Sequence, residues 1–219
     1  MIQLVIFDMD GLMFDTERLT CNSFLKKMAS LGIKATVDDF RLQLGLKKSD
    51  NLAVYRQLYG DVIDPETLYE EVGKDARAIM ERDGVPEKRG LKELISAINQ
   101  RGLKKTIASG SSREVIWKNL KSTDLEGEFT EEDLISAIEI EHGKPAPDIF
   151  LALCQRFDVD PKDALVLEDS PNGIQAAING GIPVIAVPDL AVIPEDLADQ
   201  CLTVADSLLD VIPVIEKNS

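Results

Sequence analysis

Two aspartates, Asp8 and Asp10, follow a short apolar run near the N-terminus, in the segment VIFDMDGLMFDTE. Side chains two positions apart in an extended chain point to the same side, so both carboxylates converge where this predicted strand ends. Adjacent carboxylates repel each other unless a proton, a cation or distance offsets their charges. Such a pair could perform nucleophilic or acid–base chemistry. The alternative is an Asp-rich turn whose side chains only cap nearby amides.

A second acidic pair, Glu168 and Asp169, ends another apolar run in the segment LVLEDSPNG. Ligands of open α/β sheets bind at the carboxyl ends of the strands, which is where both pairs are expected. Four carboxylates gathered there would require a hard cation, and Mg²⁺ prefers oxygen ligands. The alternative for this pair is a cap for the helix that follows Pro171. The single histidine, His142, is expected to be solvated in a loop, so nothing indicates a zinc site.

Two polar segments lie between the acidic pairs. The segment TIASGSS places Ser109, Gly110 and Ser111 after an apolar run, where hydroxyls and backbone amides can bind an anion. Plain serine capping of a helix is the alternative. The segment HGKPAPDIF holds Lys144 in a loop flanked by prolines, from which an ammonium could reach a phosphate or an aspartate. Taken alone, Lys144 would be read as a surface lysine.

Apolar runs predict the elements that position these residues. Near-continuous apolar runs are typical of parallel strands covered on both faces. The predicted strands are Leu4 to Phe7, Thr106 to Ala108, Ala164 to Leu167 and Pro183 to Val187, with a final strand and helix after Leu190. Helical spacing in PDIFLALCQRF and NGIQAAINGG separates the later strands. The alternation predicts the α/β class, with a Rossmann-like, doubly wound parallel sheet.

Residues 16–84 break this alternation and contain helical patterns without a convincing strand. Cys21, Phe24, Leu25, Met28 and Leu31 form one apolar stripe, which Gly32 is expected to end. A later helix is expected to start at Asp64 and Pro65 and to bury Leu68, Val72, Ala76 and Ile79. We therefore expect a catalytic core of residues 1–15 and 85–219 with an inserted all-helical cap of residues 16–84. The cap could be a lid that selects the substrate, or a subdomain that only adds stability.

Composition excludes several classes of function. The 219 residues carry a formal net charge of −15, and a surface this acidic repels nucleic acid and anionic membranes. The three cysteines, Cys21, Cys154 and Cys201, show no CxxC spacing, which is typical of buried thiols in a reducing compartment. Neither a leader segment nor an apolar run of membrane-spanning length is apparent. We expect a cytoplasmic monomer that acts on a small molecule.

The order of these motifs resembles the haloacid dehalogenase superfamily. The segments FDMDGLMFDTE, KPAPDIF and LEDSPNGIQAA look most like the branch that contains β-phosphoglucomutase and sugar-phosphate phosphatases. The resemblance extends from about Ile2 to Val187. Members of this branch carry a helical cap after the first strand, which agrees with the predicted insertion.

The resemblance implies a role for each motif residue. Asp8 would attack phosphorus and become an aspartyl-phosphate, and Asp10 would be the general acid and base. Ser109 would hold a phosphoryl oxygen, and Lys144 would stabilise the charge on Asp8 and the phosphoryl group. The implied Mg²⁺ ligands are Asp8, the backbone carbonyl of Asp10, and Asp169 with help from Glu168.

The cap segment favours a phosphatase over a mutase. β-Phosphoglucomutases generally carry a histidine shortly after the Asp-Thr segment, where this chain has Thr20. They also carry a lysine and an arginine around a cap glycine, whereas Gly45 is followed here by Lys47 and Lys48, and lysine cannot bind phosphate in a bidentate manner. Lys48 and Arg113 remain candidate phosphate contacts, although Arg113 also fits a surface position. We expect a Mg²⁺-dependent phosphatase of small metabolites, with sugar phosphates the expected class, and keep a phosphoglucomutase and a silent binding protein as alternatives.

Overall fold

The computed structural model describes residues 1–44, 46 and 48–218. The chain divides into two compact units, one formed by Met1–Asp15 with Pro86–Ser219 and the other by Thr16–Val85. The helical unit therefore extends one residue beyond the expected insertion of residues 16–84. Gly45 and Lys47, which entered the comparison with mutases, lie outside the described residues.

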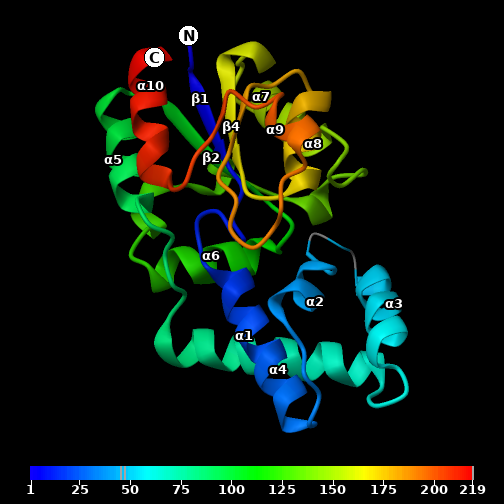
Figure 1. Ribbon diagram of the computed structural model, residues 1–219. Coiled ribbons are helices and arrows are strands. Elements are labelled where there is room, and N and C mark those ends of the chain that lie inside the picture. The colour runs from blue at the N-terminus through cyan, green and yellow to red at the C-terminus, as the bar shows by residue number, and fades with distance from the viewer. Residues whose placement is uncertain (45, 47, 219) are drawn as a thin grey trace. The chain divides into compact units, whose positions relative to one another are not determined.

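The first unit is built on a parallel sheet with strand order β3-β2-β1-β4-β5-β6 (Figure 1). The strands are β1 (Leu4–Phe7), β2 (Lys104–Ser109), β3 (Leu134–Ser136), β4 (Ala164–Glu168), β5 (Val184–Ala186) and β6 (Thr203–Val204). The chain runs outward from β1 to β3 on one side and then from β4 to β6 on the other. This confirms the predicted doubly wound α/β fold and puts the change of direction between β1 and β4, where such sheets bind ligands.

The strands form where apolar runs can be buried on both faces. Every residue of β1 and β4 is fully buried, including the terminal Glu168 of β4. The strand β3, by contrast, was not predicted from the sequence. It has only three residues and follows the acidic run Glu131–Asp133, so its local pattern is typical of a loop.

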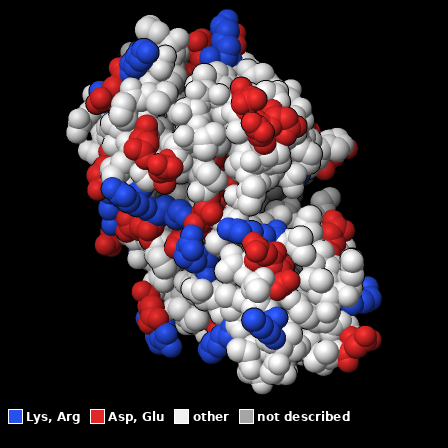
Figure 2. Space-filling model, viewed as in Figure 1, with Lys and Arg blue, Asp and Glu red and all other residues white. Residues whose placement is uncertain are grey.

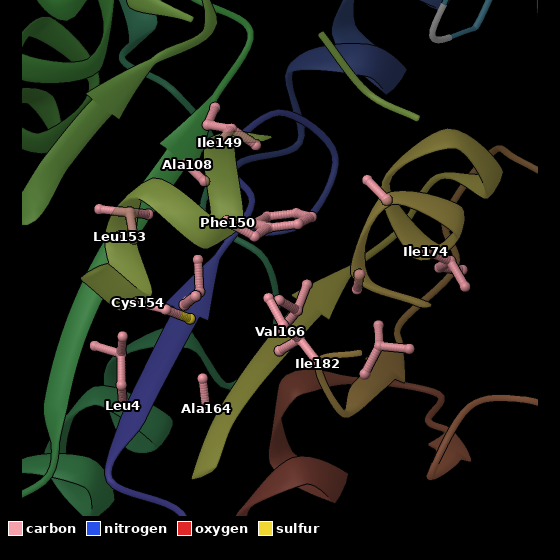
Figure 3. Close-up of a cluster of buried hydrophobic side chains, with 14 of the residues drawn as sticks. Leu4, Ala108, Ile149, Phe150, Leu153, Cys154, Ala164, Val166, Ile174 and Ile182 are labelled. Atoms are coloured by element: carbon pink, nitrogen blue, oxygen red, sulfur yellow. The ribbon is translucent and has the colours of Figure 1, made fainter. Parts of the chain in front are cut away.

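Helices cover both faces of the sheet. The helices of this unit are α5 (Leu91–Gln100), α6 (Arg113–Ser122), α7 (Asp148–Arg156), α8 (Pro171–Asn179), α9 (Glu195–Ala198) and α10 (Ile212–Asn218). Figure 1 shows α5 and α10 on one side of the sheet and α7, α8 and α9 on the other. Leu4, Val166, Phe150 and Ile174 belong to the core between the sheet and α7 and α8 (Figure 3). This packing fixes the strand ends that carry the polar residues.

The chain leaves and re-enters the first unit through two segments that pair with each other. The amide of Asp15 donates to the carbonyl of Pro86 at 2.8 Å, and the amide of Lys88 donates to the carbonyl of Met13 at 2.9 Å. Phe14 and Glu87 form an antiparallel bridge between these contacts. The ammonium of Lys88 also pairs with Asp189 at 3.0 Å. The exit and return segments are therefore held side by side.

The helical unit has its own small core. Its helices are α1 (Thr16–Ser30), α2 (Val37–Arg41), α3 (Lys48–Tyr59) and α4 (Pro65–Asp83). Asp64 caps α4 by accepting from the amide of Thr67, and Pro65 occupies its first turn, as predicted. Phe24 stacks on Tyr55, with 5.9 Å between ring centroids, and lies 5.7 Å from the Phe40 ring.

The expected stripe of α1 is partly wrong. Phe24 and Met28 are fully buried, but Leu31 is 37% exposed because α1 ends at Ser30. Gly32 follows with a φ of +72°, a conformation that favours glycine, so its predicted role in ending the helix is confirmed. Leu31 therefore lies in the turn rather than on the buried face.

Charged side chains of both signs are interspersed on the face shown in Figure 2. The overall excess is acidic, with 39 Asp and Glu against 24 Lys and Arg. Such a balance disfavours polyanionic partners. Among the described helices, none is both long and apolar enough to cross a bilayer.

Candidate active site

The strand pair β1 and β4 positions Asp8 beside Glu168. Phe7 of β1 lies opposite Leu167 of β4 in the parallel register, and the amide of Asp8 donates to the carbonyl of Leu167 at 3.0 Å. Asp8 follows β1 directly, while Glu168 is the last residue of β4. Two carboxylates from segments 160 residues apart therefore lie together at one edge of the sheet.

Lys144 bridges these two carboxylates. Its Nζ atom lies 2.5 Å from Oδ1 of Asp8 and 2.6 Å from Oε1 of Glu168. The same atom lies 5.0 Å from the centroid of the Phe150 ring, a cation–π distance. A loop lysine that could have been a surface residue is thus 84% buried and ion-paired to two strand ends.

Burial and neighbouring charges shift the pKa values of Asp8 and Lys144. Burial raises the pKa of Asp8 from 3.8 to about 8, although Lys144 acts in the opposite direction; Glu168 and Asp10 raise it further. Burial lowers the pKa of Lys144, but the attraction of Asp8 and Glu168 outweighs it and raises that pKa above its ordinary value. The ammonium is therefore fixed in its charged form, while Asp8 is poorly stabilised as a carboxylate without further positive charge.

The remaining oxygen of Glu168 is also engaged. Its Oε2 atom accepts from the amide of Ser170 at 3.0 Å and from the Ser170 hydroxyl at 2.9 Å. Ser170 is in turn the N-cap of α8 and accepts from the amide of Gly173. A Cβ atom on Gly173 would lie 1.7 Å from Oε1 of Glu168, so only glycine leaves room for this carboxylate. The first turn of α8 is shaped around Glu168.

Asp10 is held by hydroxyl groups on the other side of β1. Its Oδ2 atom accepts from the hydroxyl of Ser111 at 2.8 Å and, more weakly, from that of Ser109 at 3.4 Å. The Ser109 oxygen also accepts from the amide of Ser111 at 3.0 Å. Ser109 is fully buried at the end of β2, which pairs with β1. The predicted residues Asp10 and Ser109 are therefore brought together.

The other predicted phosphate contacts have partners of their own. The guanidinium of Arg113 donates to Glu139 at 2.8 and 3.1 Å, to Glu131 at 3.1 Å and to the carbonyl of Leu134 at 2.8 Å. These bonds tie α6 to the segment around β3, and Glu139 raises the pKa of Arg113. Lys48 is the first residue of α3 in the helical unit. Its Nζ atom lies 3.9 Å from Oε1 of Glu66 and 3.9 Å from Oε1 of Glu70.

Gly110 follows Ser109 in the turn that leads to α6. A Cβ atom there would meet nothing within 4 Å, so sterics do not demand glycine at this position. The helix itself is capped by Ser112, whose hydroxyl oxygen accepts from the amide of Val115. The hydroxyl of Ser112 thus has a structural role in the cap.

The donor set fits a hard divalent cation. Asp8, Glu168 and Asp169 are 7%, 0% and 1% exposed, and their oxygens, with the carbonyl of Asp10, are the ligand type that Mg²⁺ prefers. Burial raises the pKa of Asp8 although Lys144 lowers it, so a further positive charge would stabilise this carboxylate. Within residues 1–44, 46 and 48–218, no three acidic, histidine or cysteine side chains already surround one point. A cation here would therefore also use the backbone, water or substrate, as Mg²⁺ commonly does.

Sequence reasoning named Ser111 only as part of an anion site, and it missed Ser136. Ser111 contacts Asp10, and the hydroxyl of Ser136 donates to the carbonyl of Ser111 at 2.8 Å. Ser136 lies opposite Ser109 in the register of β2 and β3. The SGSS segment gave a signal for Ser111. Ser136 gave none, because it ends β3, a strand that the sequence did not predict.

Comparisons with known proteins agree with this geometry. A family model described as haloacid dehalogenase-like hydrolase matches residues 5–187. A phosphorylated carbohydrates phosphatase of Thermotoga maritima is 26% identical over 181 residues, which are 83% of this chain and 82% of that protein. The mitochondrial (DL)-glycerol-3-phosphatase 1 of Arabidopsis thaliana is 33% identical over 218 residues, 95% of this chain and 71% of that protein.

A solved structure gives the same result for the fold. A haloacid dehalogenase-like protein from Agrobacterium tumefaciens is 26% identical, with a TM-score of 0.82 and 99% of each chain covered. This chain belongs to the haloacid dehalogenase-like hydrolases, as the motifs indicated. Within that family it is a phosphoric monoester hydrolase.

Proposed function

We propose that this chain is a Mg²⁺-dependent phosphatase of small phosphorylated metabolites, with sugar phosphates the expected class, and that it works through an aspartyl-phosphate on Asp8. The observation that carries the proposal is the Lys144 ammonium, held between buried Asp8 and Glu168 at the ends of neighbouring strands. Relatives named for phosphorylated carbohydrates and glycerol phosphate support the substrate class.

In the first step, an oxygen of Asp8 forms a bond to phosphorus while the bond from phosphorus to the leaving oxygen breaks. Asp10 donates its proton to that leaving oxygen, and the alcohol departs. Lys144 offsets the repulsion between the Asp8 carboxylate and the phosphoryl dianion, and Ser109 donates to a phosphoryl oxygen. The product of this step is a phosphorylated Asp8 with Asp10 as a carboxylate.

In the second step, Asp10 accepts a proton from water as the water oxygen bonds to phosphorus. The bond between phosphorus and Asp8 breaks, which releases inorganic phosphate and restores the protonated Asp10. Asp8, Asp169, Glu168 and the carbonyl of Asp10 would hold Mg²⁺. When bound, Mg²⁺ would neutralise part of the charge on the phosphoryl oxygens.

The helical unit is proposed to select the substrate. It is inserted between Asp15 and Pro86, only a few residues after the nucleophile in the chain. Insertions of this kind commonly act as lids that exclude water and bind the leaving group. Lys48 is the described cation of this unit that we retain as a candidate substrate contact, whereas the bonds of Arg113 to Glu131 and Glu139 remove it from the proposal.

The test is hydrolysis of p-nitrophenyl phosphate with and without Mg²⁺, followed by a screen of sugar, polyol and glycerol phosphates ranked by kcat/KM. We expect turnover that EDTA abolishes and Mg²⁺ restores. Mass spectrometry of Asp10→Asn after mixing with substrate should show one added phosphoryl group, located on Asp8. No turnover across the panel would overturn the proposal in favour of a binding protein, and rapid glucose-phosphate isomerisation with a bisphosphate primer would indicate a mutase.

A further inference from the structure

A chain of hydrogen bonds runs across the ends of three neighbouring strands. The hydroxyl of Ser136, at the end of β3, donates to the carbonyl of Ser111 in the turn after β2. The hydroxyl of Ser111 donates to Oδ2 of Asp10, which follows β1. Both bonds measure 2.8 Å, near the most common length for a hydroxyl donor. Asp10 is thereby connected to a turn that the sheet itself holds in place.

The two serines next to Asp10 differ in what they can do during the reaction. A hydroxyl has one proton to donate, so Ser109 cannot donate to a phosphoryl oxygen and to Asp10 at the same time. Its present bond to Asp10 is the longer one, at 3.4 Å. The shorter bond from Ser111 requires no such exchange. It is therefore the contact that can persist while Ser109 turns to the phosphoryl group.

Further contacts hold the turn that contains Ser111. The amide of Ser136 donates to Oε1 of Glu139 at 3.1 Å, and Glu139 is ion-paired to Arg113 at 2.8 Å. Arg113 lies in the first turn of α6, two residues after Ser111. The part of the turn that leads into α6 is consequently held by two contacts, one from Ser136 to the carbonyl of Ser111 and one through Arg113. A fixed turn can hold a carboxyl group in one orientation at a small cost in entropy.

We propose that Ser111 is a positioning residue that holds the carboxyl group of Asp10 in the orientation needed for proton transfer. The inference rests on the proposed phosphatase function, in which Asp10 protonates the leaving oxygen. Ser111 acts through Asp10 and needs no contact with the substrate. Its effect should therefore follow the demand for acid catalysis, which is high for an alkyl phosphate and low for p-nitrophenyl phosphate, because nitrophenolate leaves without a proton.

The experiment compares kcat/KM for p-nitrophenyl phosphate with kcat/KM for the alkyl phosphate that performs best in the screen of sugar, polyol and glycerol phosphates. We expect Ser111→Ala to lower the alkyl value about tenfold and the nitrophenyl value less than about twofold. Ser111→Thr, which retains the hydroxyl, should recover most of the loss. Ser112→Ala is the matched control, since this neighbouring hydroxyl caps α6, and it should leave both values within about twofold.

A double-mutant cycle locates the effect on Asp10. In an Asp10→Asn background, adding Ser111→Ala should change the alkyl rate less than about twofold, because the group that Ser111 positions has already been replaced. An equal loss for both substrates, a rise in KM for both, or full additivity with Asp10→Asn would overturn the inference and leave the phosphatase proposal intact. A wild-type protein without phosphatase activity would overturn the proposed function itself.

Discussion

The two sides of the candidate site are held by different forces. On the β4 side of β1, Asp8 and Glu168 are buried and held by an ion pair to Lys144. On the β2 side, Asp10 is held by neutral hydroxyl groups. Buried charge is costly to leave unpaired, whereas a lost neutral hydrogen bond costs far less. We therefore expect substitutions on the Asp8 side to affect activity and stability together, and those on the Asp10 side to affect mainly the rate.

The largest effect is expected for Asp8→Asn. The amide keeps the size of the side chain but is not a nucleophile, so hydrolysis should fall at least about 10⁴-fold. The measurement is kcat/KM for p-nitrophenyl phosphate with saturating Mg²⁺. A variant that retained a tenth of the wild-type rate would show that phosphorus is attacked by another group.

Lys144→Ala should damage both folding and catalysis. It leaves Asp8 and Glu168 buried without their shared cation, which is expected to cost about 3–5 kcal/mol of unfolding free energy. Losing a cation aimed at the phosphoryl group should lower kcat about 10²–10³-fold. Urea titration and steady-state kinetics measure the two effects. Lys162→Ala is the control, because the ion pair of Lys162 with Asp160 is exposed, and it should change neither by much.

Gly173→Ala tests whether the position of Glu168 matters. The added methyl group would overlap Oε1, so the carboxylate must move and release Lys144. We expect a loss of about 1–3 kcal/mol in unfolding free energy and about a tenfold loss in kcat. Gly127→Ala is the matched control, since a Cβ atom there meets nothing within 4 Å. Equal behaviour of the two variants would contradict this account of α8.

The raised pKa of Asp8 predicts how stability depends on pH in the absence of metal. The folded carboxyl has a pKa of about 8 against an ordinary value of 3.8, so the folded state binds the extra proton between these values. Stability should therefore fall as pH rises through this window. With EDTA present, the Tm of Asp8→Asn should rise relative to that of wild type by on the order of 10 °C as the pH is raised from about 5 to about 8. A difference in Tm between Asp8→Asn and wild type that does not change with pH would contradict the pKa argument.

The smallest effect is expected for Ser136→Ala, at the far end of the hydroxyl network. Removing the donor to the carbonyl of Ser111 should loosen the turn and lower alkyl-phosphate kcat about two- to fivefold, with unfolding free energy lowered by about 1 kcal/mol. Ser122→Ala is the control, because its hydroxyl also donates to a backbone carbonyl, that of Asn119, away from Asp10. An equal loss of kcat in Ser136→Ala and Ser122→Ala would show that Ser136 does not act on Asp10 through Ser111.

The sequence was most informative where an acidic residue follows or ends an apolar run that predicts a buried strand. Asp8 follows a short buried apolar run and Glu168 ends another, so their meeting at one end of the sheet could be predicted. The partner of Asp10 could not, because Ser111 is fixed by Ser136 and β3 has too few residues to produce a pattern. The ion pairs of Arg113 could not be predicted either. They join it to Glu131 and Glu139, which are 18 and 26 positions away, and contacts over such separations leave no pattern in the local sequence.

The pairing of the exit and return segments has a consequence for how this chain can be re-engineered. Because the amide of Asp15 donates to the carbonyl of Pro86, the two cut points of the insertion are already neighbours. A short turn could join them, or a helical module from a relative could be grafted between them, without stretching the segment after β1 that contains Asp8 and Asp10. Under the proposed role of the helical unit, chimaeras made at these two residues should exchange substrate preference and leave Asp8 and Asp10 in place.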